Sequence, residues 1–121
     1  MLFRSELAEY RRKTAAQTAL GLTHLFTGRD LDGATAGIAY VGSLCSSRFG
    51  AGLSEARRGA TIDSLVAAHE IGHSFGAPHD AEAGSVCQNT PATFLMAPTI
   101  NGSDQFSACS IEQMQIGRAH V

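Results

Sequence analysis

The spacing of apolar residues predicts a helix in the first part of the chain. Its apolar stripe recurs at steps of three and four residues and consists of Leu7, Tyr10, Thr14, Thr18, Leu22 and Leu25. Arg11, Arg12 and Lys13 fall mostly off this stripe, so this basic run is expected on a solvated face.

The segments after this helix alternate between turn-forming and apolar residues. Residues 27–34, TGRDLDGA, are a cluster of turn formers that ends the helix. Residues 35–44, TAGIAYVGSL, predict a mostly buried strand. Residues 45–55, CSSRFGAGLSE, are rich in glycine and short of apolar side chains, which predicts a loop leading into a short edge strand near Gly52 and Leu53.

A second helical pattern runs from about Asp63 to Phe75 and has a wide apolar face. Asp63 or Ser64 is expected to cap its start. Gly76 can adopt the left-handed conformation that ends a helix, and Pro78 forbids its continuation. The chain is therefore expected to turn away sharply after Phe75.

The stretch HEIGHSFGAPHD, residues 69–80, holds three of the five histidines of the chain. Because residues four apart on a helix lie one turn above each other, His69 and His73 present their rings from one face. Two such rings can bind one metal ion, and catalytic zinc generally takes three protein ligands plus water. His79 lies on the returning arm of the turn and is placed to offer the third ring. Glu70 points beside the metal without being forced to bind it.

Composition limits what this pattern can mean. The 121 residues suffice for about one small domain, and a net charge of −2 with scattered charges gives no indication of nucleic-acid or anionic membrane binding. No apolar run approaches the roughly 18–20 residues that a membrane-spanning helix needs.

The cysteines, Cys45, Cys87 and Cys109, are odd in number. In an oxidising compartment one of them lacks a partner within this chain. Three reduced, buried thiols in a cytosolic protein are the alternative.

Both ends of the chain differ in character from the rest. The strings LFRS and IGRAHV resemble translated sequencing-adapter oligonucleotides. We therefore expect residues 6–115 to be native and residues 1–5 and 116–121 to be non-native tails that do not contribute to the fold. The alternative is an ordinary but unusual pair of termini.

The stretch HEIGHSFGAPHD resembles the zinc-binding signature of the metzincin metalloendopeptidases, and Asp80 after the third histidine resembles their adamalysin or reprolysin branch. LFTGRDLDGATAGIAYVGSLC resembles the helix, turn and strand that precede the active site in that branch. FLMAPTI resembles its Met-turn, and FSACS resembles the segment that follows. The resemblance covers most of residues 15–110.

This resemblance implies an α/β (α+β) fold of the zincin-like metzincin type. A mixed sheet packs on helices, the active-site helix ends at a glycine turn at Gly76, and the Met-turn lies below the metal. Residues 6–115 would then be a partial catalytic domain that lacks the strands forming the first part of the family's sheet. Met96 would pack under the imidazoles as an apolar floor and not as a ligand.

The resemblance also assigns the chemistry of the site. His69, His73 and His79 are implied as ligands of one catalytic zinc ion, and Glu70 as the general base. Asp80 is implied as a structural residue that hydrogen-bonds back toward the active-site helix. Calcium is not indicated by the sequence.

Substrate contacts are implied at two places. Ala97, Pro98, Thr99 and Ile100 form one wall of the pocket that accepts the substrate side chain just after the scissile bond. The strand at Gly52 and Leu53 pairs with an extended peptide by β-augmentation.

The resemblance further implies a disulfide between Cys87 and Cys109 that encloses the Met-turn. Cys45 resembles a cysteine whose usual partner lies further along the chain, so that an odd count is what truncation would leave. A disulfide in turn implies a secreted parent protein.

The function implied is a zinc-dependent endopeptidase that acts on proteins or peptides, with a zinc-activated water as nucleophile and Glu70 as base. A second hypothesis stays open: a non-catalytic truncated fragment, or a pseudoprotease that only binds metal. The intact histidine pattern favours the first hypothesis, and the unusual ends of the chain favour the second.

Overall fold

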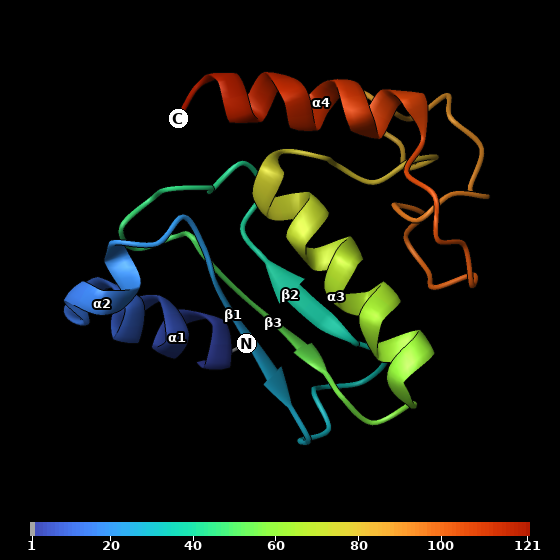
Figure 1. Ribbon diagram of the computed structural model, residues 1–121. Coiled ribbons are helices and arrows are strands. Elements are labelled where there is room, and N and C mark those ends of the chain that lie inside the picture. Colours follow the sequence, from blue (N-terminus) through green and yellow to red (C-terminus); the bar gives the residue numbers. More distant parts are fainter. Residues whose placement is uncertain (1) are drawn as a thin grey trace.

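The computed structural model describes residues 2–121, which form three strands and four helices (Figure 1). In chain order these elements are α1 (Leu2–Lys13), α2 (Ala15–Thr18), β1 (Thr23–Thr27), β2 (Gly37–Ala39), β3 (Ala51–Glu55), α3 (Ala60–Phe75) and α4 (Ala108–Ala119). No helix within this described range has the length and apolar character needed to cross a bilayer.

The strands form one mixed sheet with the order β1-β3-β2. β1 runs parallel to β3, with Leu25 opposite Leu53, and β2 runs antiparallel to β3, with Ile38 also opposite Leu53. The central strand β3 is buried along its whole length. A mixed sheet packed on helices is the architecture that the resemblance implied, and this expectation is confirmed.

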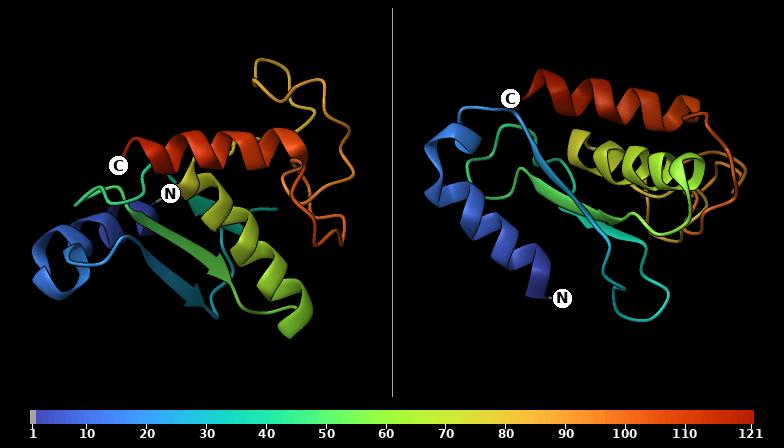
Figure 2. Two further views of the ribbon diagram at one scale, coloured as in Figure 1. Left: turned by 45° about the horizontal axis from the view of Figure 1, so that its top comes forward. Right: turned by 60° about the horizontal axis from the view of Figure 1, so that its bottom comes forward.

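The helices lie in layers around the sheet. α1 and α2 lie on one side of it and α3 on the other, as the two further views show (Figure 2). α4 crosses the C-terminal end of α3, where the backbone carbonyl of Gln113 would lie 3.1 Å from a Cβ placed on Gly76. The chain between α3 and α4 contains no helix or strand; it leaves the C-terminal end of α3 and loops back beside that helix before α4 begins (Figure 1).

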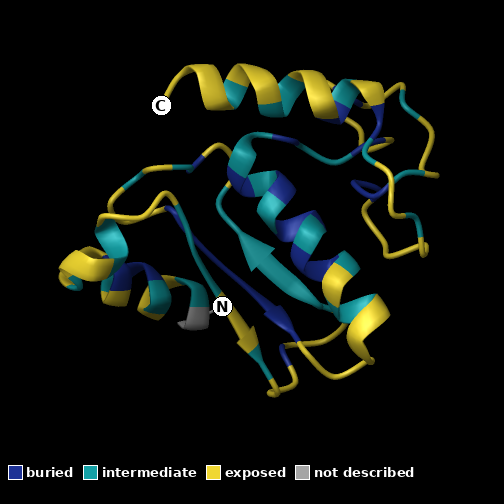
Figure 3. Cartoon of the chain, viewed as in Figure 1, coloured by how far each residue is buried: buried dark blue, intermediate teal, exposed yellow. Residues whose placement is uncertain are grey.

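Buried residues concentrate along β3 and the inward face of α3, as the burial colouring shows (Figure 3). Leu53 and Val66 are fully buried and join these two elements in the core. β1 is the edge strand on the opposite side of the sheet from β2, and its Leu25 and Phe26 are 45% and 54% exposed. The core therefore lies beneath α3, and β1 contributes less to it.

The predicted long opening helix is wrong beyond Thr18. The backbone of Thr14 is extended, and its Oγ1 donates a hydrogen bond to the carbonyl of Tyr10, which separates α1 from α2. Leu22 lies in a connecting segment and Leu25 belongs to β1. The sequence THLFT is rich in β-branched and aromatic residues, which fit a paired strand better than a helix.

The expected exposure of the whole basic run is wrong for Arg11, which is fully buried. Its guanidinium donates hydrogen bonds to three backbone carbonyls, those of Ser46 (2.9 Å), Gln17 (2.7 Å) and Leu20 (2.8 Å). A fourth bond, of 3.0 Å, goes to Oγ1 of Thr23 at the start of β1. Arg11 therefore ties α1 to α2, to the segment between α2 and β1, to the start of β1, and to the loop before β3.

The expected edge position of the strand at Gly52 and Leu53 is also wrong, because β3 is the central strand. Gly52 in β3 and Gly50 just before the strand reflect close packing and not an exposed edge. A Cβ on Gly50 would lie 2.8 Å from the backbone oxygen of Ser46 and 3.0 Å from Nε of Arg11. A Cβ on Gly52 would lie 3.2 Å from Nδ1 of His24. Small residues are thus required where α1 and β1 approach the centre of the sheet.

The strand predicted within residues 35–44 is present but short. Only Gly37–Ala39 pair with β3, and all three are half-buried. Tyr40 and Val41 follow the strand, and the ring of Tyr40 packs edge-on against Phe49 with centroids 5.0 Å apart. The edge strand of this region is therefore β2 and not β3.

The helix predicted from about Asp63 to Phe75 begins earlier than expected. α3 starts at Ala60, with Gly59 at the N-cap and no side-chain cap there. Asp63 lies in the first turn, and its Oδ1 accepts hydrogen bonds from the backbone N–H groups of Arg57 and Arg58. From the first turn of α3, the Asp63 carboxylate thus fixes the loop that precedes the helix.

The predicted boundaries of the native part remain a prediction. Residues 2–5 form the first turn of α1, and residues 116–119 continue α4. Met1 lies outside the described residues.

Replacing Arg11 by Ala is expected to lower the free energy of unfolding by about 3 kcal/mol or more, because buried carbonyl groups would lose their donors. The neighbouring Arg12 is a matched control, since its ion pair with Glu9 lies at the surface. Arg12→Ala should leave the free energy of unfolding nearly unchanged. Urea denaturation measures both, and equal effects of the two substitutions would contradict the assignment.

Candidate metal centre

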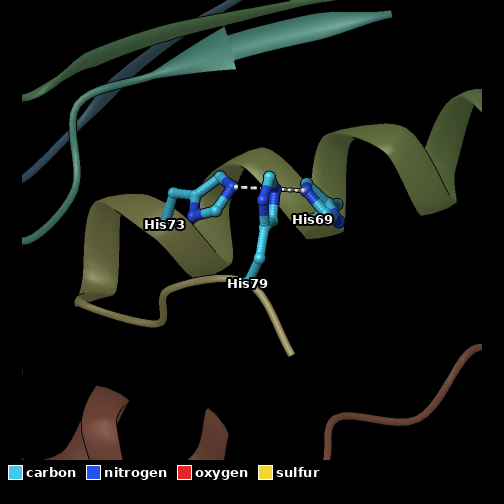
Figure 4. A group of neighbouring side chains, drawn as sticks. All are labelled: His69, His73 and His79. Atoms are coloured by element: carbon cyan, nitrogen blue, oxygen red, sulfur yellow. Dashed lines mark hydrogen bonds between the residues drawn. The ribbon is translucent and has the colours of Figure 1, made fainter. Parts of the chain in front are cut away.

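Two turns of α3 and the segment after it bring three imidazole rings together. His69 and His73 project from one face of the helix, as their four-residue spacing predicts, and His79 approaches from the returning chain (Figure 4). Gly76 ends the helix with a φ of 116°, in the left-handed region. The N–H of Ala77 then donates to the carbonyl of Gly72, which closes the turn.

The three rings present their Nε2 atoms to one common point. Nε2 of His79 lies 3.2 Å from Nε2 of His69 and 3.2 Å from Nε2 of His73 (Figure 4). His69 is buried, whereas His73 and His79 are half-buried. The ring centroids are separated by 4.8 to 5.2 Å. This convergence is the spatial arrangement that three ligands of one metal ion require.

The opposite ring nitrogens are engaged with acceptors. Nδ1 of His69 lies 2.7 Å from the carbonyl oxygen of Leu95, and Nδ1 of His73 lies 2.7 Å from that of Ala77. Because a carbonyl oxygen only accepts, each Nδ1 carries the proton and donates it. Nδ1 of His79 lies 3.3 Å from Oε2 of Glu82, which is also an acceptor.

These contacts test whether the site fits a metal ion. With protons on Nδ1 of His69 and His73, the Nε2 atoms of these two rings carry unshared electron pairs, and both face Nε2 of His79. Electron pairs directed at one point favour a cation between the three nitrogens. Burial lowers the pKa of His73 to about 4, with a contribution from the charge of His69, and burial also lowers the pKa of His69. The rings of His69 and His73 are therefore neutral at neutral pH, which is the form that binds zinc.

Glu70 is buried beside this cluster, with 7% of its surface exposed. Burial raises its pKa to about 7. β2 leaves room for its side chain, since a Cβ on Gly37 would lie 2.6 Å from Cγ of Glu70 and 3.0 Å from its Oε2. A carboxyl group whose pKa lies near neutrality can both take up and release a proton.

An open cavity of about 660 Å³ adjoins the three histidines and Glu70. Residues 34–39 and Val41 line one side of it, so that the free edge of β2 borders the cleft. Pro98, Thr99 and Ile100 line the cavity together with Pro78 and Glu82.

The substrate-binding residues expected from the sequence are only partly found at this cavity. Pro98, Thr99 and Ile100 line it, but Ala97 is 2% exposed and is not among the lining residues of the described chain. Gly52 and Leu53 are buried within β3, which is paired on both sides. The expectation that they pair with a peptide is therefore wrong, because neither offers a free backbone edge.

Met96 is fully buried next to α3. A Cβ on Gly72 would lie 3.0 Å from its Sδ and 3.0 Å from the ring of Phe106, so only glycine fits at that helix position without a shift. The preceding residue, Leu95, provides the carbonyl that accepts from His69. The segment around Met96 thus supports the helix and holds one imidazole.

Asp80 is fully buried. Its carboxylate was expected to hydrogen-bond toward α3, but this expectation is wrong, because the carboxylate bonds to residues at the start of α4. Its Oδ1 accepts hydrogen bonds from the hydroxyls of Ser107 (3.0 Å) and Ser110 (3.4 Å) at the start of α4. Its backbone N–H donates to the carbonyl of Met96. Asp80 therefore joins the third histidine to α4 and to the Met96 segment. The start of a helix favours a carboxylate there.

A disulfide joins Cys87 to Cys109, with a Cα–Cα distance of 5.9 Å. This is the pairing that the resemblance implied. Cys45 is free and exposed. The bond ties the segment after His79 to the first turn of α4.

Several contributors to the site were missed by sequence reasoning. Gly37 is needed for space, the carbonyls of Leu95 and Ala77 accept from ring nitrogens, and Glu82 lies beside His79. Backbone carbonyl acceptors cannot be identified from the sequence, because every residue has a carbonyl group. Glu82 follows His79 by three positions, but its contact with that ring depends on how the chain turns.

Comparison with known proteins defines the class to which this site belongs. The family model of the reprolysin-like metallopeptidases, family M12B, matches residues 5–120. The chain belongs to this metallopeptidase family. Membership implies zinc as the metal, and the three-histidine cluster is compatible with a zinc site.

Individual relatives agree with the family. The chain is 34% identical over 110 residues to the zinc metalloproteinase-disintegrin-like protein atrase-A of Naja atra, a match that covers 89% of this chain and 18% of that protein. It is 38% identical over 91 residues to the hemorrhagic metalloproteinase-disintegrin-like protein kaouthiagin of Naja kaouthia, covering 75% and 22%. A zinc metalloproteinase-disintegrin-like protein of Cerberus rynchops is 37% identical over 89 residues, covering 71% and 14%. The chain thus spans about a fifth of the length of these relatives or less.

The close approach of Gly37 and Glu70 predicts energetic coupling between them. Gly37→Ala should lower the free energy of unfolding by about 1–3 kcal/mol, because the new methyl group overlaps the Glu70 side chain. In a Glu70→Ala background the methyl group has space, so the same substitution should cost at least about 1 kcal/mol less.

Gly28→Ala is the matched control, since a Cβ there meets nothing within 4 Å. Its effect should be independent of Glu70→Ala to within about 0.5 kcal/mol. Urea denaturation of the single and double variants gives the free energies of unfolding for this double-mutant cycle. Additive effects of Gly37→Ala and Glu70→Ala would contradict the packing described above.

Proposed function

We propose that the chain is the zinc-binding part of an endopeptidase catalytic domain and hydrolyses peptide bonds in proteins or peptides. His69, His73 and His79 hold the zinc ion, and Glu70 is the general base. The observation that carries this proposal is the convergence of three Nε2 atoms beside a buried carboxylate and an open cleft.

When bound, zinc lowers the pKa of a water ligand toward about 7 and polarises a carbonyl group. Glu70 accepts a proton from the attacking water and then donates it to the nitrogen of the leaving amine. Without a metal ion, burial raises the pKa of this carboxyl group to about 7, and a bound cation lowers it, so Glu70 is ionised and ready to accept the proton when zinc is bound. Gly37 keeps the space in which this side chain lies.

The substrate is proposed to bind as an extended strand along the free edge of β2. Gly37, Ile38 and Ala39 pair with β3 on one side, and the cavity adjoins them. The other side of β2 pairs with no strand among residues 2–121, so its backbone groups can pair with a peptide by β-augmentation, apart from the Ala39 carbonyl, which accepts from Nη1 of Arg4 at 3.5 Å. Apolar residues of the cavity, including Ile38, Pro98 and Ile100, favour an apolar substrate side chain near the scissile bond.

The protein is proposed to act outside the cell. The disulfide between Cys87 and Cys109 supports an oxidising compartment, because such bonds are rare in reducing ones. The zinc metalloproteinase names of two relatives are consistent with the proposed activity.

A direct test combines metal content with activity. The purified chain is expected to bind one zinc ion per molecule and to cleave a generic protein substrate such as casein. A chelator should abolish the cleavage and added zinc should restore it. Stoichiometric zinc without cleavage would instead support a pseudoprotease that only binds metal.

Glu70→Gln separates binding from chemistry. The substitution removes the proton acceptor and leaves the three histidines in place, so zinc content should be unchanged while the turnover number falls about 100-fold to 10,000-fold. Exposed Glu112 on α4 provides the control, and Glu112→Gln should leave both quantities at the wild-type level. Undiminished cleavage by Glu70→Gln would remove Glu70 from its role.

A further inference from the structure

We propose that Glu82 is a positioning residue for the third zinc ligand. Its carboxylate holds the proton on Nδ1 of His79 and thereby directs Nε2 toward the metal. This inference rests on the proposed function, since it concerns how that site is held together.

His79 is supported differently from the other two histidines. His69 and His73 belong to α3, and their Nδ1 atoms face backbone carbonyls at 2.7 Å, which the fold itself fixes. His79 belongs to an irregular segment, and its side chain is 25% exposed. The acceptor beside its Nδ1 is a side chain, Oε2 of Glu82 at 3.3 Å. The orientation of the third ring therefore depends on one replaceable residue.

The backbone is shaped so that Glu82 returns toward His79. Ala81, between them, has a φ of 60°, which is unusual for a residue with a Cβ. Its N–H donates to the carbonyl of Cys87, and the hydroxyl of Ser85 donates to the carbonyl of His79 at 2.6 Å. The disulfide to α4 anchors Cys87 in turn. These bonds close residues 79–87 into a loop and sustain the left-handed conformation of Ala81, which brings the Glu82 carboxylate beside Nδ1 of His79.

A carboxylate on the far nitrogen of a metal-binding histidine has two effects. It fixes the tautomer and orientation of the ring, and it raises the basicity of the ligating nitrogen. Removing such a partner typically weakens metal affinity about 10- to 100-fold. Glu82 is 54% exposed, so its contact with His79 adds little to folding stability. An effect on zinc affinity can therefore be separated from an effect on the fold.

The test measures the zinc dissociation constant of the full chain by competition with a chromophoric chelator. Glu82→Ala is expected to weaken zinc binding about 10- to 100-fold. Glu82→Gln should lose less, because its amide oxygen still accepts from Nδ1–H although the charge is gone. Exposed Glu112, on α4, serves as the control, and Glu112→Ala should bind zinc as the wild type does.

Urea denaturation of the metal-free proteins accompanies the titration and should give the same midpoint for all four. The order wild type, Glu82→Gln, Glu82→Ala in falling affinity, with unchanged midpoints, supports the assignment. Equal affinity of Glu82→Ala and wild type would overturn it while leaving the zinc site intact. Absence of zinc binding by the wild type would overturn the proposed function, and the role of Glu82 with it.

Discussion

The site depends on one constraint: three imidazole Nε2 atoms must face the same point while the Nδ1 atom of each ring faces an acceptor oxygen. A helix alone satisfies this for two rings, because His69 and His73 lie one turn apart. The third ring requires the chain to reverse, which the left-handed Gly76 allows. The carbonyls of Leu95 and Ala77 then fix the proton positions, so the irregular segment after α3 contributes to the site as much as the helix does.

The sheet contributes space and an edge to this centre. β3 fills the middle of the sheet and packs against α3, which leaves the outer side of β2 facing the cleft. Gly37 on that strand provides the room in which the buried Glu70 side chain lies. Burial in turn raises the pKa of Glu70 into the range in which a proton is readily exchanged. The position of β2 in the sheet therefore affects the pKa of Glu70, because Gly37 on this strand allows the carboxyl group to be buried.

The sequence predicted the convergence of the three histidines correctly, whereas parts of the surrounding fold were predicted wrongly. The spacing of histidines, Gly76 and Pro78 is local, so one helix and one turn suffice to place them. The strand at Gly52 was misassigned because its glycines indicate an exposed edge as readily as close packing, and only the position of Arg11 and His24 distinguishes the two. Arg11 itself was predicted as exposed, since its backbone acceptors in distant segments have no signature in residue types. Long-range contacts of this kind cannot be inferred from periodicity.

The outer side of β1 has a consequence for how this chain behaves at high concentration. No strand among residues 2–121 pairs with that side, and Leu25 and Phe26 on the same strand are each about half exposed. Unpaired backbone donors and acceptors next to apolar side chains form a template on which another polypeptide can add as a strand. Self-association through this edge would leave the cleft beside β2 open, because the two lie at opposite ends of the sheet.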